Sequence, residues 1–186
     1  MTPFHELMAQ IEADDADGAV AALIDAGTAV VEPLIAALDA AGPNTRAHAA
    51  DALGEIGDRR ATGPLARALA DPAPHVQVSA ALALGELGDS AAVSALRAAL
   101  GGADGSARGA ACIALGQIGQ AEAVGAVLPL LADDVAQVRG AAAWTLGRLG
   151  DRCAADALRQ RLSDDSADVR EAAGEALGRL ERLHSF

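Results

Sequence analysis

Tyrosine and lysine are absent from this chain of 186 residues, which has one Trp, two Phe and two Cys. Aromatic residues make up 2% of it, and the β-branched and aromatic residues that sheets prefer are scarce. Ala and Leu, which both favour helices, supply most of the 52% hydrophobic content. The shortage of sheet-forming residues predicts an all-α protein.

Positive charge is also in short supply. The formal net charge is −12, and all 14 basic residues are Arg. Such a surface repels phosphates, which disfavours nucleic acid as a partner, and no basic amphipathic face for a membrane surface is visible. Acidic residues, Gly or Pro interrupt the apolar runs short of a membrane span, and residues 1–15 lack the pattern of a signal peptide. We therefore expect a cytoplasmic protein that binds neither nucleic acid nor membranes.

Residues with catalytic or metal-binding chemistry are few and scattered. Cys112 and Cys153 are far apart in the sequence and lack metal-ligand spacing, so we expect two reduced thiols packed as small hydrophobic residues. No Ser or Cys stands at a signature spacing from a His, and there is no Gly-rich phosphate loop. The sequence predicts no catalytic residues, no metal and no cofactor. The four histidines fall in separate parts of the chain: His5, His48, His75 and His184.

An internal repeat dominates the sequence. The element Ala-Leu-Gly recurs with a period of 31 residues, and further columns of Leu and Ala keep the same register without an insertion. Its glycines are Gly54, Gly85, Gly116, Gly147 and Gly178. Each repeat is predicted to form two helices. Residues 91–100 show the apolar spacing of a first helix, and residues 75–86 show that of a second helix.

Caps and turns mark the ends of these helices. A left-handed C-cap is predicted after the first four second helices, at Gly57, Gly88, Gly119 and Gly150. Asp58, Asp89 and Asp151 follow and can start the next helix. The Gly inside each second helix costs about 1 kcal/mol relative to Ala. Its recurrence predicts that the neighbouring second helix approaches too closely for a Cβ.

The unit Asp…Val-Arg-x-x-Ala-Ala-x-Ala-Leu-Gly-x-Ile/Leu-Gly-Asp resembles the HEAT-like repeat of phycobilisome lyases and is similar to the alphaRep scaffolds. The resemblance implies an α-solenoid, a right-handed superhelix of about five repeats in a single domain, residues 1–186, with its second helices lining a concave surface. It also implies an ion-pair ladder between repeats, with weak points at Gln77 and Gly102. The ladder residues are Arg46, Arg108, Arg139 and Arg170 with Asp71, Asp133 and Asp164. The expected segments are a helical cap, 1–27, and repeats 28–58, 59–89, 90–120, 121–151 and 152–186, the last with the polar outer face of a terminal cap.

A helical wheel places three variable columns on the face of the second helices that points away from the core. The column of Trp144 has an apolar centre, and the column four residues later changes from acidic to Arg along the chain. The small residues Gly109, Ala110, Gly140 and Ala141 leave room beside it. The predicted partner-binding residues are Asp51, Glu55, Val78, Ser79, Leu82, Glu86, Ile113, Gln117, Trp144, Arg148 and Arg179.

The predicted function is that of a non-enzymatic scaffold that binds a protein or peptide, or another copy of itself, with Leu82, Ile113 and Trp144 as its apolar anchor. Two alternatives stay open. The three apolar residues could simply pack against one another as neighbours. The resemblance also allows a subunit of a bilin lyase or a related tetrapyrrole-handling protein.

Overall fold

The computed structural model describes Glu6 and residues 16–183, and every regular element within these residues is helical. The predicted helical cap, 1–27, lies partly outside the described residues, at 1–5 and 7–15. The chain divides into two compact units, Met1–Ala92 and Val93–Phe186. The prediction of a single repeat domain stays a prediction, and each unit is described by itself.

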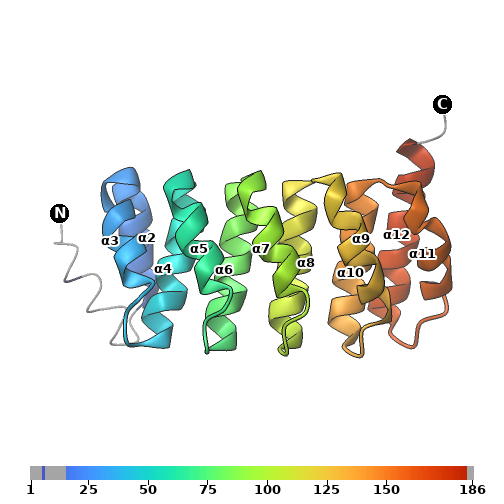
Figure 1. The fold of residues 1–186 in the computed structure, drawn as a ribbon, viewed down its shortest axis with the longest axis horizontal. Helices are drawn as coiled ribbons and strands as arrows, with labels where there is room; N and C mark the ends of the chain where they lie inside the picture. The colour runs from blue at the N-terminus through green and yellow to red at the C-terminus, as the bar shows by residue number, and fades with distance from the viewer. Residues whose placement is uncertain (1–5, 7–15, 184–186) are drawn as a thin grey trace. The chain divides into compact units, whose positions relative to one another are not determined.

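The first unit stacks two-helix repeats on the helix α2. Within a repeat the first helix is short and begins with a 3₁₀ turn, and the second helix has 14 residues. Each first helix packs on its own second helix, and α4 packs along α6 (Figure 1). The elements in chain order are α2 (Ala16–Ala26), η1 (Gly27–Val30), α3 (Val31–Ala37), α4 (Pro43–Ile56), η2 (Arg59–Ala61), α5 (Thr62–Ala68), α6 (Pro74–Leu87) and η3 (Ser90–Ala92).

The second unit has the same arrangement, with α10 packed between α8 and α12. The first helices α7 and α11 pack on α8 and α12, and the segment α9–η5 packs on α10 (Figure 1). The elements are α7 (Val93–Ala99), α8 (Gly105–Ile118), η4 (Ala121–Ala123), α9 (Val124–Val127), η5 (Leu128–Ala132), α10 (Ala136–Leu149), η6 (Arg152–Ala154), α11 (Ala155–Arg161) and α12 (Ala167–Leu183).

The predicted caps are confirmed. The glycines after the second helices have left-handed backbone angles, with φ of 73°, 61°, 76° and 74° at Gly57, Gly88, Gly119 and Gly150. The Asp58 carboxylate accepts a hydrogen bond from the Arg60 N–H at 3.0 Å, and Asp89 and Asp151 act in the same way. What the sequence did not reveal is that each of these Asp caps opens a 3₁₀ turn before the α-helix begins.

Leucines fill the core, as the repeat columns predict. Leu53 and Leu84 on the second helices of the first unit are fully buried, and so are Leu115 and Leu146 in the second unit. The last repeat differs, because Leu177 is only half-buried and the charged residues of its second helix are exposed. That exposure agrees with the predicted polar face of the C-terminal cap. These exposed charges are Asp168, Arg170, Glu171, Glu175, Arg179, Glu181 and Arg182.

The Gly inside the second helices lies where helices touch. A Cβ on Gly54 would stand 2.8 Å from the Ala83 Cα, and a Cβ on Gly147 would stand 2.7 Å from the Ala176 Cα. At Gly116 it would stand 2.8 Å from Cζ3 of the Trp144 ring. The predicted close approach of successive second helices is therefore confirmed within both units.

The Arg–Asp ladder is also present. Arg46 donates two hydrogen bonds to Asp71, at 2.7 and 2.8 Å, and the same bidentate geometry joins Arg108 to Asp133 and Arg139 to Asp164. The remaining guanidinium nitrogen of each Arg, Nη1, donates to backbone carbonyls in the turn of its own repeat. Each pair thus fixes a turn to the next repeat, which is the role that the resemblance implied.

Two positions of the ladder carry other residues. Gln77 stands in the Arg column, and its amide donates to the Asp71 carbonyl at 2.6 Å. Gly102 stands in the Asp column and has no carboxylate. Arg170, in the last repeat, binds only the carbonyls of Asp164 and Asp165 among the described residues. The ladder pairs therefore lie within the units, one in the first and two in the second.

One apolar segment is longer than expected. Val20–Ala37 has 18 residues and a mean hydropathy of 1.7, enough to cross a membrane by length and composition alone. The expectation that every apolar run is too short is wrong by this measure. The helix is interrupted by Gly27 with φ of 60°, and Leu23, Val31 and Leu34 are buried in the repeat core. In all, 22% of the segment is buried.

The close contact at Gly147 predicts an unusual response to alanine. Gly→Ala in a helix normally stabilises by about 1 kcal/mol, but at Gly147 the new methyl would meet the backbone of α12. We expect Gly147→Ala to lower the free energy of unfolding by about 1–3 kcal/mol, measured by urea denaturation. Gly140→Ala in the same helix is the matched control, because its Cβ would meet only Val169 Cγ2 at 4.0 Å, and it should stabilise by up to about 1 kcal/mol. Equal effects of the two substitutions would contradict this account.

The ladder predicts a loss of stability in acid. The Arg guanidinium hydrogen bonds hold the pKa of Asp71, Asp133 and Asp164 below the ordinary value. The stability from a lowered pKa is present above the unfolded value, about 3.9, and is lost as the pH falls through the folded value. We expect Asp133→Asn to lower the urea midpoint at about pH 7, with a difference from the parent chain that shrinks below about pH 4. Asp39→Asn, at an exposed position, should match the parent at both pH values. A deficit of Asp133→Asn that persists at about pH 2 would overturn this assignment.

Candidate binding surface on the second helices

The residues predicted to face a partner all remain at least partly accessible. In the first unit they lie on α4 and α6, and in the second unit on α8, α10 and α12. Leu82 belongs to the first unit, whereas Ile113 and Trp144 belong to the second, so a continuous apolar stripe through all three stays a prediction. The exposed members are Glu55, Leu82, Glu86, Gln117, Arg148 and Arg179, and the half-buried ones are Asp51, Val78, Ser79, Ile113 and Trp144.

In the first unit this surface is acidic. Asp51 and Glu55 lie on α4, and Glu86 on α6 reaches back over Gly54. Burial raises the pKa of Asp51, while the Ser79 hydroxyl and His48 act in the opposite direction. Burial also raises the pKa of Glu86, and the charges of Glu55 and Asp51 add to the shift. Because their pKa values are raised, Asp51 and Glu86 oppose folding when they are ionised, and this contribution is relieved as the pH falls toward the unfolded values.

In the second unit the surface is organised around Trp144. The indole is half-buried, and its Cζ3 edge lies over Gly116 of α8. The Arg148 guanidinium stands 5.1 Å from the ring centroid, and its Nε donates to the Gly116 carbonyl at 3.0 Å. Arg148 therefore holds the indole against α8 through a cation–π contact and anchors itself to the same helix. Trp144 thus packs on the neighbouring helix α8 and stays partly accessible, and its contact with a partner stays a prediction.

A hollow lies on one side of the indole, in the second unit. It has a volume of about 520 Å³, and we call it the apolar hollow. The small residues Gly140 and Ala141 line this hollow and leave space in it, as predicted. Gly109 and Ala110 are buried and line neither this hollow nor the second one described below. Its lining is Ile113, Ala136, Gln137, Gly140, Ala141, Trp144, Ser166, Asp168 and Ala172.

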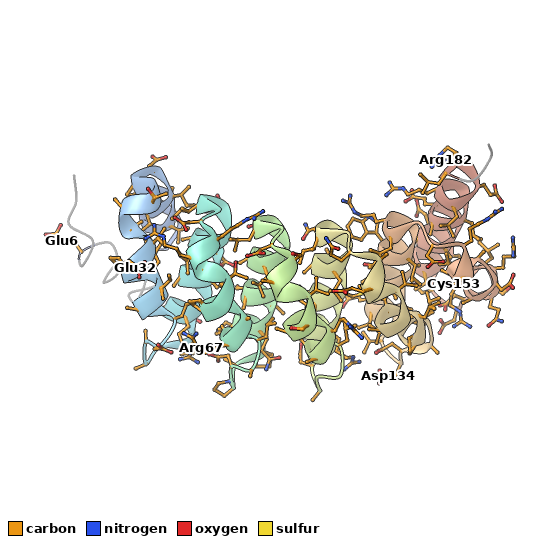
Figure 2. All side chains as sticks on the ribbon, turned by 45° about the horizontal axis from the view of Figure 1, so that its top comes forward. Glu6, Glu32, Arg67, Asp134, Cys153 and Arg182 are labelled. Carbon is orange, nitrogen blue, oxygen red and sulfur yellow. The ribbon has the colours of Figure 1, made fainter. Side chains whose placement is uncertain are left out.

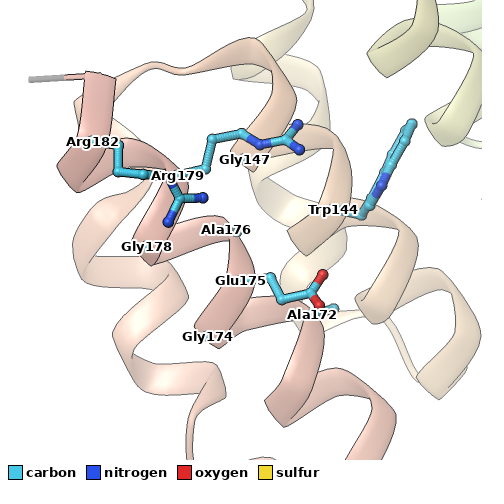
Figure 3. A pocket seen from close by; sticks show the side chains of 9 residues that line it. All are labelled: Trp144, Gly147, Ala172, Gly174, Glu175, Ala176, Gly178, Arg179 and Arg182. Carbon is cyan, nitrogen blue, oxygen red and sulfur yellow. The ribbon is translucent and has the colours of Figure 1, made fainter.

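A second hollow of about 550 Å³ shares the Trp144 wall, and we call it the arginine hollow. Figure 3 shows the indole and the Arg179 side chain at opposite sides of it, with the Glu175 carboxylate between the two helices. Arg182 follows one helical turn later and belongs to the same lining, which the sequence analysis missed (Figures 2 and 3). Its spacing of three from Arg179 on the same helix was the available signal. The remaining lining residues are Gly147, Ala172, Gly174, Ala176 and Gly178.

The two cysteines differ from each other. Cys112 is fully buried, as predicted, and contacts the Thr145 hydroxyl at 3.6 Å. Burial raises the pKa of Cys112 to about 12, so at neutral pH it is a packed thiol rather than a nucleophile. Cys153 is exposed at the start of η6 (Figure 2), so the expectation that it packs as a small hydrophobic residue is wrong. No group of three His, Cys, Asp or Glu among the described residues could hold a metal ion.

Repeated helix pairs with this surface define an α-solenoid repeat protein. The family model for HEAT repeats matches residues 31–107 and 98–178. The chain therefore belongs to the HEAT repeat family. No curated protein sequence matches it.

Solved structures agree with this assignment. The fold is similar to that in the complex of CpcE and CpcF of phycocyanin lyase from Nostoc sp. PCC7120, at 27% identity and a TM-score of 0.68, over 100% of this chain and 79% of that chain. It is also similar to an engineered protein at 21% identity and a TM-score of 0.66, over 98% of each chain. A designed armadillo repeat protein in complex with the peptide (KR)4 is 19% identical, with a TM-score of 0.67 over 96% of this chain and 100% of that one. At 21% and 19% identity, the last two similarities show a shared fold only.

The environment of Trp144 predicts its fluorescence, because the chain has one Trp and no Tyr. We expect partial quenching by acrylamide, since the indole is half-buried. Arg148→Ala should shift the emission to the red and increase quenching, because it removes the guanidinium that covers the ring. Arg97→Ala on α7 makes the same truncation at an exposed position and should leave the spectrum unchanged. A spectrum that is insensitive to Arg148→Ala would contradict the stacked geometry.

Proposed function

We propose that this chain is a non-enzymatic HEAT repeat scaffold that binds a protein or peptide through the exposed face of its second helices. The observation that carries the proposal is the half-buried Trp144 with a hollow on each side. Trp is among the residue types most enriched at binding hot spots, and this Trp is anchored yet accessible. Burial of the remaining half of the indole against a partner can contribute about 2 kcal/mol, at roughly 75 Å² and 25 cal/mol per Å².

The arrangement around Trp144 also favours binding over simple packing. Arg148 fixes the indole before a partner arrives, so little side-chain freedom is lost on association. The small residues Gly140 and Ala141 keep the adjoining surface low enough for a partner side chain to enter. A ring that served only to fill the gap over Gly116 would need neither feature.

A second candidate is a subunit of a bilin lyase or a related tetrapyrrole-handling protein. The likeness to the complex of CpcE and CpcF at 27% identity favours it. The two candidates are distinguished by mixing the purified chain with a phycobilin. A saturable change in the visible absorption of the phycobilin that is lost in Trp144→Ala supports the second candidate and argues against the first.

The binding function is tested with a displayed library of random peptides. We expect enriched peptides to bind the parent chain and to lose about thirtyfold in affinity on Trp144→Ala, the effect of removing a hot-spot residue worth about 2 kcal/mol. Leu162→Ala is the matched control, because Leu162 is an exposed apolar residue that lines neither hollow. Trp144→Ala should keep the helical content of the parent chain, measured by circular dichroism.

Two results would count against the proposal. One is a set of enriched peptides that bind the parent chain and Trp144→Ala equally. The other is a blue shift of Trp144 emission with rising protein concentration, in step with dimer formation in sedimentation, which would make a second copy the partner.

A further inference from the structure

The two hollows beside Trp144 differ in chemistry, and this difference restricts the partner. The apolar hollow is lined mainly by Ile113, the indole and small residues, and its polar lining residues are Gln137, Ser166 and Asp168. The arginine hollow has two guanidinium groups, from Arg179 and Arg182, and one carboxylate, from Glu175. In a chain with a formal net charge of −12, the arginine hollow is a local exception with an excess of positive charge.

The arginines of this hollow also differ from those of the ladder. Arg46, Arg108 and Arg139 each make a bidentate ion pair with an Asp of the next repeat. No ion pair within the described part of the chain uses Arg179 or Arg182, and both side chains are exposed. Their donors are therefore available to a partner's carboxylate, which an Arg binds with good geometry.

The hollows adjoin each other, because Trp144 and Ala172 belong to the lining of both. One short segment of a partner can therefore enter both. In an extended segment, residues two apart point to the same side, so an apolar side chain and an acidic one at that spacing fit the two hollows together.

We propose that the second unit binds an acidic, extended peptide segment in which a bulky apolar side chain fills the apolar hollow. A Glu or Asp two residues away then pairs with Arg179 and Arg182. The inference rests on the proposed function and adds the chemistry of the partner to it. Arg148 takes no direct part, since its Nε is bound to the Gly116 carbonyl and its guanidinium covers the indole.

The experiment is a focused library displayed in a Gly/Ser background, with one varied apolar residue followed two positions later by Glu, Asp, Gln, Lys or Arg. The probe is the full purified chain at low ionic strength, where exposed ion pairs are least screened. We expect peptides with Glu or Asp to be enriched about fivefold or more over those with Lys or Arg. The preference should weaken as salt is added.

Charge reversal in the hollow supplies the decisive comparison. Arg179→Glu with Arg182→Glu should invert the preference, so that Lys and Arg peptides are enriched. The matched control, Arg97→Glu with Arg152→Glu, changes the net charge equally at exposed positions outside both hollows and should keep the acidic preference. Because all four positions are exposed, both double variants should fold like the parent chain, which circular dichroism checks.

The outcomes separate this inference from the proposed function. Enrichment that depends on Trp144 and on the apolar residue but not on the charged position would overturn the acidic partner and leave the binding function standing. A shift of preference that is the same in both double variants would also overturn it, because net charge alone would then explain the selection. No enrichment over Trp144→Ala for any peptide would overturn both.

Discussion

The close contact between successive second helices is the constraint on which the rest of each unit depends. At Gly54 and Gly147 the backbone of the next helix lies where a β-carbon would be. Gly in a helix is unfavourable by about 1 kcal/mol, and at Gly54, Gly116 and Gly147 the close approach of the next helix offsets this cost. The facing residues, Ala83 and Ala176, are small for the same reason. Such contact brings many atoms of the two helices within van der Waals range.

The close packing of the second helices also determines which side chains can reach the next repeat. An Arg near the start of one second helix lies within hydrogen-bond distance of the Asp 25 positions later, in the turn of the next repeat. The remaining donor of the Arg closes its own turn by binding backbone carbonyls. The ladder thus neutralises three carboxylates of a strongly acidic chain and satisfies turn carbonyls with the same side chain.

The Trp144 surface is a variation on the same contact. At Gly116 the group that fills the space beside the helix is the indole ring, together with Thr145, in place of the Ala that faces Gly54 and Gly147. The larger side chain extends past the contact and divides the surface into an apolar and an arginine hollow. An inter-repeat packing position has in this way become the wall of a candidate binding site. The Thr145 hydroxyl, which donates to the Cys112 carbonyl at 2.9 Å, ties α10 to α8 beneath the ring.

The sequence by itself determined the helices, their caps and the ladder, because each depends on local chemistry or on a strict period of 31 residues. Gly57 and Asp58 could be assigned by register, and the pair Arg46–Asp71 by register together with the resemblance to HEAT repeats. Tertiary structure decided what depends on distances between side chains: that Trp144 packs on Gly116 beneath Arg148 yet stays accessible, and that Arg182 joins Arg179 beside it. It also decided that Cys153 is exposed while Cys112 is buried. A helical wheel gives the direction of a side chain but not its reach, and these features depend on how far a side chain extends over the neighbouring helix.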